Sequence, residues 1–265
     1  MAITLGRLEG LITVPTGGWT GTVNDGGGAD TWTIAAGTYY LLSVGSAANH
    51  FLKTFELALE AAQGGSWTVS ITATENGTGI VTVALNGGGT AAINWTSTDA
   101  RDLMGFTGNL SAAATHVATR QARSLWIADC PVNTPYGGSD SGTDLAATAQ
   151  MVSPAGHVTG VRTNRMVHSR IWWDACAHTK TRIAGETTVN TSFQKWWRDT
   201  VEGTAGWAAA PFGPFRLYPD AGDDTTYKTY KVGGELAKTF APEQVQDGWL
   251  GLWRIVMDRV YEVPS

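Results

Sequence analysis

The spacing of the apolar residues changes from a helical period to a strand period within residues 46–85, and this change restricts the fold. Six apolar positions share one helical face: Ala48, Phe51, Leu52, Phe55, Leu59 and Ala62. Ser46 is a suitable N-cap, and Gly64-Gly65 end the helix. Residues 67–73 then alternate apolar and polar, Asn76-Gly77 supplies a turn, and residues 80–85 return as the partner strand. A helix followed by a hairpin predicts an α+β unit.

The same kind of pattern extends this unit over residues 37–130. Residues 38–44, 91–95 and 117–127 are predicted strands. Residues 96–99 (Thr-Ser-Thr-Asp) have the capping-box pattern, which predicts a short helix through Met104 that Gly105 closes. Residues 1–36 are rich in Gly and Thr, and short strands are expected at 19–23 and 31–34. We expect residues 1–36 to be an extended arm with little core of its own, ordered mainly against another copy or protein.

The second half of the chain is predicted to be a β-rich module over residues 135–265. Pro131, Pro135 and the Ser/Asp/Gly cluster at 139–143 mark the boundary. Strands are predicted at residues 158–161, 166–174, 215–218, 226–232 and 250–263. Residues 191–194 form a second capping box, opening a helix with Phe193, Trp196, Trp197 and Val201 on one face. The predicted fold class is therefore α+β and mainly β, with one or two helices in the second module.

The charge content favours association with neighbouring subunits and excludes several functions. Charged residues make up 15% of the chain, against roughly 25% in typical domains. A surface of Thr, Ser, Asn, Gly and Ala suits subunit contacts, because few ions must be desolvated, although an ordinary secreted β protein is an alternative. The net charge of −5 argues against a nucleic-acid surface, and no apolar stretch is long enough to span a membrane. Residues 1–7 lack a signal-peptide pattern, which predicts synthesis in a cytoplasm, where Cys130 and Cys176 fit buried free thiols.

Two stretches resemble structural proteins of tailed bacteriophages. Residues 92–111 combine a strand, a short helix and the run Leu-Met-Gly-Phe-Thr-Gly, which is similar to the end of a small α+β module of virion proteins. Residues 214–220, 225–230 and 252–255 resemble the closing strands of tail-associated proteins, with a Tyr-Pro-Asp corner, a Tyr-rich strand and a final Trp-containing strand. The resemblance covers about half of the chain and implies a virion component. Neither stretch carries a catalytic signature.

No sequence motif marks an enzyme or a cofactor site. Asp220, Asp223 and Asp224 could hold Ca²⁺, but they lack EF-hand spacing, and a solvated turn is favoured. The five histidines show no i, i+4 pair that would suggest a metal site; they are His50, His116, His157, His168 and His178. Glu186 and Asp199 are candidate glycosidase carboxylates, but nothing in the sequence pairs them. We therefore predict no catalytic, cofactor-binding or metal-ligating residue, and no cofactor.

The twelve tryptophans are the strongest signal for a different function. Trp172-Trp173 and Trp196-Trp197 could line a glycan platform, because aromatic faces stack on sugar rings. Core packing and subunit contact are favoured, since adjacent residues of a strand point to opposite faces and Trp196 shares the apolar helical face with Phe193.

The sequence thus favours a non-enzymatic, homo-oligomeric structural protein of a tailed-phage particle, made in the host cytoplasm and located in the virion. The tail or tail tip is preferred as its place, and its partners would be other copies and other virion proteins, with no membrane and no specific nucleic acid. A carbohydrate- or receptor-binding tail protein that contacts a host glycan is the alternative, as is a capsid decoration protein.

Overall fold

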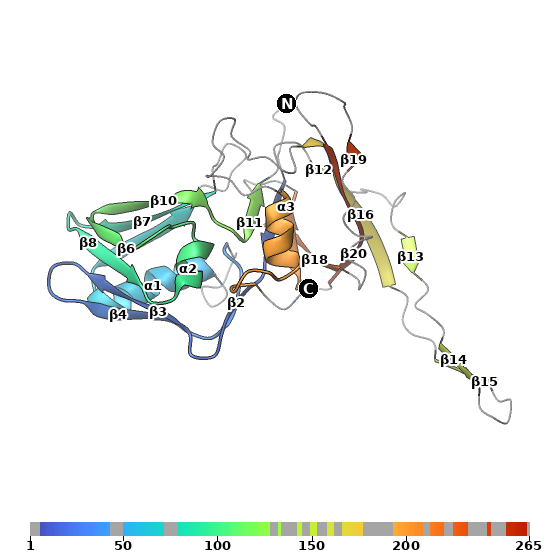
Figure 1. Ribbon diagram of the computed structural model, residues 1–265, viewed down its shortest axis with the longest axis horizontal. Helices are drawn as coiled ribbons and strands as arrows, with labels where there is room; N and C mark the ends of the chain where they lie inside the picture. Colours follow the sequence, from blue (N-terminus) through green and yellow to red (C-terminus); the bar gives the residue numbers. More distant parts are fainter. Residues whose placement is uncertain are drawn as a thin grey trace.

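The fold is mainly β, with antiparallel sheets and helices packed against them (Figure 1), as the sequence patterns predicted. For strands β12–β16, β19 and β20 the backbone alone is described. The computed structural model describes residues 6–42, 50–71, 79–127, 132–133, 142–144, 149–152, 158–161, 166–176, 193–208, 213–219, 225–232, 243–244 and 253–263.

Two antiparallel sheets form the first part of the chain. The first has the strand order β4-β3-β8-β9 and the second β10-β7-β6. Alternating residues of β3 and β8 are buried on one side, which is the period-two pattern of a half-buried strand. The strands are β3 Trp19–Asn24, β4 Asp30–Ile34, β6 Ser66–Ile71, β7 Ile80–Asn86, β8 Ala91–Trp95, β9 Leu110–Ala113 and β10 Thr115–Gln121.

Helix α1, Phe51–Gln63, packs against strands of both sheets. It begins later than the predicted residue 47, because His50 is its N-cap and the His50 Nδ1 accepts the Lys53 N–H at 2.7 Å. The predicted cap Ser46 lies outside the described residues. Gly64 ends the helix as predicted, with a φ of 67°.

Helix α2, Thr98–Leu103, forms where the sequence predicted a short helix, but the capping-box prediction was wrong. The N-cap is Ser97 rather than Thr96, and its side chain makes no capping hydrogen bond. The Ser97 hydroxyl instead accepts the Thr20 N–H of β3 at 2.9 Å, so a tertiary contact replaces the local one. Gly105 follows with a φ of 83°, and a Cβ there would lie 2.1 Å from the Arg120 carbonyl oxygen.

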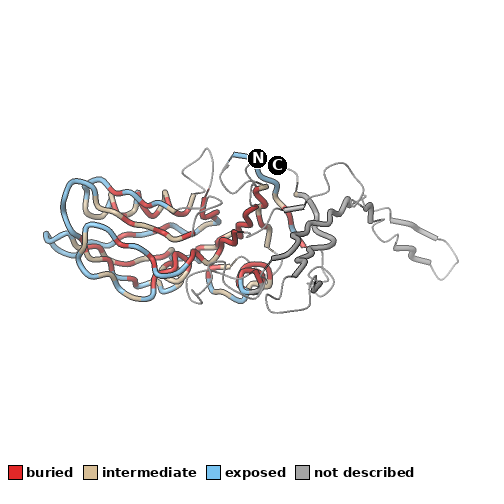
Figure 2. The backbone as a smooth tube through the Cα atoms, turned by 90° about the horizontal axis from the view of Figure 1, so that it is seen from above, coloured by how far each residue is buried: buried red, intermediate tan, exposed pale blue. Residues whose placement is uncertain are grey.

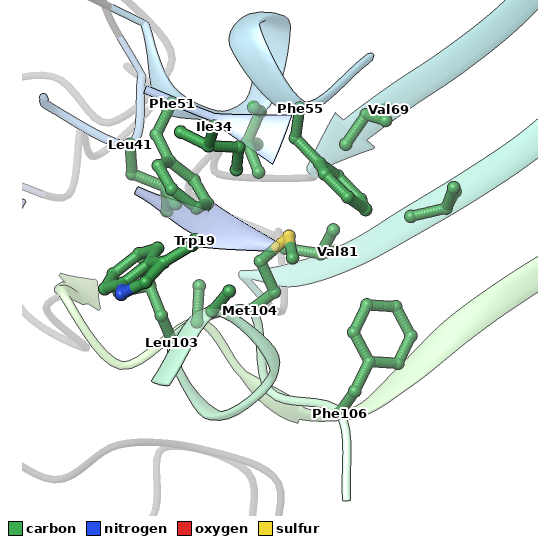
Figure 3. Packing of buried hydrophobic residues seen from close by; sticks show 14 of the residues in the cluster. Trp19, Ile34, Leu41, Phe51, Phe55, Val69, Val81, Leu103, Met104 and Phe106 are labelled. Atoms are coloured by element: carbon green, nitrogen blue, oxygen red, sulfur yellow. The ribbon is translucent and has the colours of Figure 1, made fainter. Parts of the chain in front are cut away.

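An aromatic cluster fills the core between these sheets and α1 (Figure 3). Trp32 makes edge-to-face contacts with Phe55 and Trp95, at centroid distances of 5.1 and 5.5 Å. Trp95 stacks on Phe106 at 5.6 Å. Leu103, Met104 and Phe106 point into the same core in Figure 3 and are buried.

The described part of the expected N-terminal arm belongs to the fold, so that expectation was wrong. Residues 7–34 supply four strands, and the apolar residues of β2–β4 are buried in the same cluster as α1. The Gly/Thr-rich composition did not indicate this core, because its buried Trp, Val and Ile residues stand singly between polar residues. The additional strands are β1 Arg7–Gly10, β2 Ile12–Val14 and β5 Gly37–Tyr39.

A nine-stranded sheet joins both halves of the chain. Its main order is β11-β1-β17-β18-β20-β16-β12, with β13 paired to β16 and β19 to β20. Strands β1 and β11 come from the first half of the chain, so the sheet crosses the boundary predicted at 131–143. The division into modules 37–130 and 135–265 stays a prediction. Its remaining strands are β11 Leu125–Ile127, β12 Val132–Asn133, β13 Gly142–Asp144, β16 Met166–Cys176, β17 Phe215–Tyr218, β18 Lys228–Val232, β19 Glu243–Gln244 and β20 Trp253–Glu262.

Two further elements complete the described chain. A separate hairpin pairs β14, Ala149–Val152, with β15, Val158–Val161, and lies at the right-hand end of Figure 1. Helix α3, Phe193–Trp196, continues as a π-helical turn, Trp197–Val201, beside β11. In Figure 2, buried segments continue from the two-sheet unit into this central region. Leu125, Ile127 and Trp207 of the central region belong to the same core cluster as α1.

Phe106 is the residue whose truncation tests this packing. Phe106→Ala removes a buried ring that stacks on Trp95, and should lower the free energy of unfolding by about 3–5 kcal/mol. Chemical denaturation is the measurement. Val117→Ala, at a position that is 59% exposed, is the control and should change stability by less than about 0.5 kcal/mol. Equal losses in the two variants would contradict the packing.

Candidate functional site

All eight tryptophans whose side chains are described are buried. They are Trp19, Trp32, Trp67, Trp95, Trp126, Trp196, Trp197 and Trp207. The core interpretation is therefore confirmed for Trp196 and Trp197, while Trp172 and Trp173 occupy adjacent positions of β16 and their side chains lie outside the description. Within the described side chains, no tryptophan offers a flat exposed face to a sugar ring.

The helical segment 193–201 is held against the first half of the chain by its aromatic face. Phe193 packs edge-to-face on Trp126 of β11 at 4.9 Å, and the Trp196 indole N–H donates to the Ser124 carbonyl oxygen at 2.9 Å. The sequence predicted this shared face correctly, and all four residues on it are buried. The face is thus a packing surface.

Asp199 forms the charged contact of the same segment. Its Oδ2 accepts the Arg123 Nε–H at 3.1 Å and the Nη2–H at 2.7 Å, and the Lys195 ammonium lies 3.0 Å away. The Asp199 side chain is only 8% exposed. Asp199 thus joins the helical segment to Arg123 through a charged contact. Glu186, its suggested glycosidase partner, lies outside the described residues.

The candidate metal and histidine positions are partly described. The His50 ring caps α1, and the His116 Nε2 lies 2.8 Å from the Ala91 carbonyl oxygen. In the part of the chain that the structure describes, no three His, Cys, Asp or Glu residues are grouped for a metal. Of the other candidates, the structure describes either no part or the backbone alone; they are Cys130, His157, His168, Cys176, His178, Asp220, Asp223 and Asp224.

A buried polar cluster that sequence reasoning missed lies where β1 meets β17. We call Arg7, Glu9, Tyr40, Arg216 and Tyr218 the joint cluster. Strand register places Arg7 opposite Tyr218 and Glu9 opposite Arg216. Arg7 and Glu9 are fully buried. The only sequence signal was the alternation of these polar residues with Leu8, Phe215 and Leu217, which normally indicates a solvent-facing side.

Aromatic rings and one backbone amide hold the charges of the joint cluster. The Arg7 guanidinium lies 3.9 Å from the centre of the Tyr218 ring. The Arg216 guanidinium lies between two rings, 3.7 Å from the centre of Tyr40 and 4.1 Å from that of Tyr227. The Leu42 N–H donates to Glu9 Oε1, which ties the segment after β5 to β1. The cluster therefore connects β1, β17 and residues 40–42.

Burial determines the protonation of the joint cluster. Desolvation raises the pKa of Glu9 from 4.5 to about 7, and the Leu42 N–H, Arg7, the Tyr218 hydroxyl and Arg216 oppose that rise. Desolvation likewise raises the pKa of Tyr40 to about 12 and raises that of Tyr218. Both phenols therefore stay neutral, and the Tyr218 hydroxyl lies 3.4 Å from the Leu42 carbonyl oxygen, to which it donates.

Comparisons with protein-family models, with curated proteins and with solved structures found no match for this chain. In the described part of the chain, no helix has the length and apolar character needed to cross a membrane.

Asp199 provides a test of the contact between the helical segment and the first half. Asp199→Asn leaves the Arg123 guanidinium without its carboxylate, and we expect the free energy of unfolding to fall by about 2 kcal/mol. Asp102→Asn breaks the more exposed Arg101–Asp102 pair and should cost less than about 1 kcal/mol. Denaturant titration of both variants measures the difference, and similar small losses would show that Asp199 does not stabilise the contact.

Proposed function

We propose that this chain is a non-enzymatic structural component of a tailed-bacteriophage particle, in the tail or tail tip, which acts through contacts between copies and with other virion proteins. The observation that carries the proposal is a group of neighbouring uncharged side chains on the outer side of the three-stranded sheet, while the exposed Arg120 lies farther along β10. The resemblance of residues 92–111 and of residues 214–220, 225–230 and 252–255 to virion proteins supports the choice of particle.

We call this surface the hydroxyl face. Strand register aligns Thr68, Ala84 and Thr115 in one row across β6, β7 and β10, and Ser70, Thr82 and Val117 in the next. The Asn86 amide donates to the hydroxyls of Ser66 and Thr68, at 3.1 and 3.0 Å. The hydroxyl face comprises Ser66, Thr68, Ser70, Thr82, Ala84, Asn86, Thr115 and Val117.

An uncharged face of this kind is suited to protein contact. Burying it desolvates hydroxyl and amide groups, which can pair with a partner, and no ion. Val117 is 59% exposed within it and offers an apolar contact. A face of two or three short rows covers a few hundred Å², less than the ~800 Å² per partner of a stable complex. Repeated contacts in a multi-copy assembly would supply the remaining area.

The edge of this sheet beside α1 is closed, which favours contact through the face. Glu56 Oε2 accepts the Val69 N–H at 2.9 Å, and Glu60 Oε1 accepts the Trp67 N–H at 3.3 Å. Both amides belong to the edge strand β6, and the carboxylates of α1 take the place of a neighbouring strand. A second copy therefore cannot extend the sheet at β6 without displacing α1.

Val117→Glu tests the role of the hydroxyl face. A carboxylate at a contact must be desolvated, so we expect self-association to weaken about tenfold or more while the fold is kept. Sedimentation velocity over a range of concentrations measures this. Leu57→Glu is the matched control, because Leu57 is 44% exposed on α1, between Lys53 and Glu60. This variant should associate like the parent protein. A parent protein that stays monomeric at every concentration would contradict the proposal.

Titration with host-surface polysaccharide fragments separates the assembly function from glycan binding. Because the described tryptophans are buried, we expect no saturable change in tryptophan emission on addition of the fragments. Trp172→Ala is the informative variant, and Trp196→Ala, which opens the core, is the control for lost stability. A saturable change that Trp172→Ala abolishes in a folded protein would favour the carbohydrate- or receptor-binding alternative.

A further inference from the structure

Strand β1 has a polar side that is shielded from water by both of its neighbours. It pairs with β11 and with β17, and Glu9 lies opposite Leu125 on the first and Arg216 on the second. Leu8 is buried on the other side of β1, so neither side of the strand is open to solvent. A side chain at this position therefore gains or loses its proton in a buried environment, without contact with water.

The groups around Glu9 come from each element that packs on the joint cluster. Arg7 lies on the same strand, and Arg216 and Tyr218 lie on β17. Tyr40 and the Leu42 N–H come from the segment after β5, and Tyr227 precedes β18 and covers Arg216. The β11 residues are apolar: Leu125, Trp126 and Ile127.

Only part of the Glu9 carboxyl group is satisfied by hydrogen bonds. Oε1 accepts the Leu42 N–H, while Oε2 is buried and has no hydrogen-bond partner among the described residues. An ionised carboxylate needs several donors to replace water, whereas a neutral carboxyl group needs fewer. This environment therefore suits the protonated acid better than the carboxylate.

We propose that Glu9 makes the attachment of β1 to β17 and to residues 40–42 depend on bound proton, so that the joint between the two halves of the chain weakens as the pH rises to neutral. The protonated acid fits the buried site and keeps the Leu42 contact. Loss of the proton leaves a buried carboxylate, and opening the joint hydrates it.

The sign follows from proton binding in the two states. The folded pKa of Glu9, about 7, lies above the unfolded value of 4.5, so the folded state holds the extra proton between these values. The stability that Glu9 contributes is therefore complete below about pH 4.5, falls through the interval and is lost above about pH 7. Other ionisable groups also make stability depend on pH, so the effect of Glu9 must be measured against a variant.

Glu9→Gln is that variant, because glutamine keeps the shape and stays neutral. The ratio of unfolding constants, parent over variant, should be near one at about pH 3 and rise to about 300 at about pH 8.5. As a second readout, amide exchange at Leu42 and in β1, corrected for the intrinsic rate, should accelerate with pH in the parent but not in Glu9→Gln. Curves that stay parallel would overturn the proposal.

Two further measurements keep the test decisive. Glu56→Gln alters a second buried glutamate that accepts a backbone N–H outside the joint, and should retain the parent's pH-dependent exchange at Leu42. If Glu9→Gln fails to fold, carbon NMR of the Glu9 carboxyl in the parent replaces it. A titration midpoint near 7 supports the proposal, and a midpoint below about 5 overturns it.

Discussion

The position of β1 between β11 and β17 is the constraint on which the rest of the described structure depends. One four-residue strand carries backbone hydrogen bonds to both halves of the chain. Its continuation is fixed in the same way, since the Gly10 N–H donates to Ser124 and the Thr13 N–H to Trp207. Gly10 also permits close packing, because a Cβ there would lie 1.8 Å from the Thr200 side chain. A larger residue at Gly10 would therefore separate the π-helical turn from β1.

Helix α1 has an equally specific role in the two-sheet unit, because it closes edges as well as filling the core. Glu56 and Glu60 accept backbone N–H groups of β6. The Gln63 amide donates to the Val23 and Gly28 carbonyl oxygens at the β3–β4 hairpin, each at 3.0 Å. Polar residues on one side of a helix thus complete the hydrogen bonding of two different sheets. This leaves the faces of the sheets, rather than these edges, as the surfaces open to partners.

Local patterns predicted most elements, and long-range contacts explain where they failed. The strands at 80–86, 91–95, 158–161 and 215–218 follow from alternation, and α1 and the helix at Phe193 from helical spacing. The capping box failed because Ser97 bonds to β3, which lies 77 residues away in sequence. The joint cluster was missed for the same reason: Arg7 and Glu9 resemble exposed strand residues until β17 covers them. Pairing partners more than a hundred residues apart leave no local trace in one sequence.

The charge distribution of the described chain explains how a sequence poor in charge still specifies one register. Arg7, Glu9, Glu56 and Asp199 are buried, and the hydroxyl face carries no ion. Sliding β1 by one residue along β17 would move Arg7 and Glu9 to the side of Leu8 and place apolar residues against Arg216. Such a shift would bury unpaired charges, which costs several kcal/mol. The few buried charges therefore act inside the fold, where Arg7 and Glu9 select the pairing of β1. Other charged side chains, such as Lys195 and Asp102, lie at the surface, and the hydroxyl face stays uncharged.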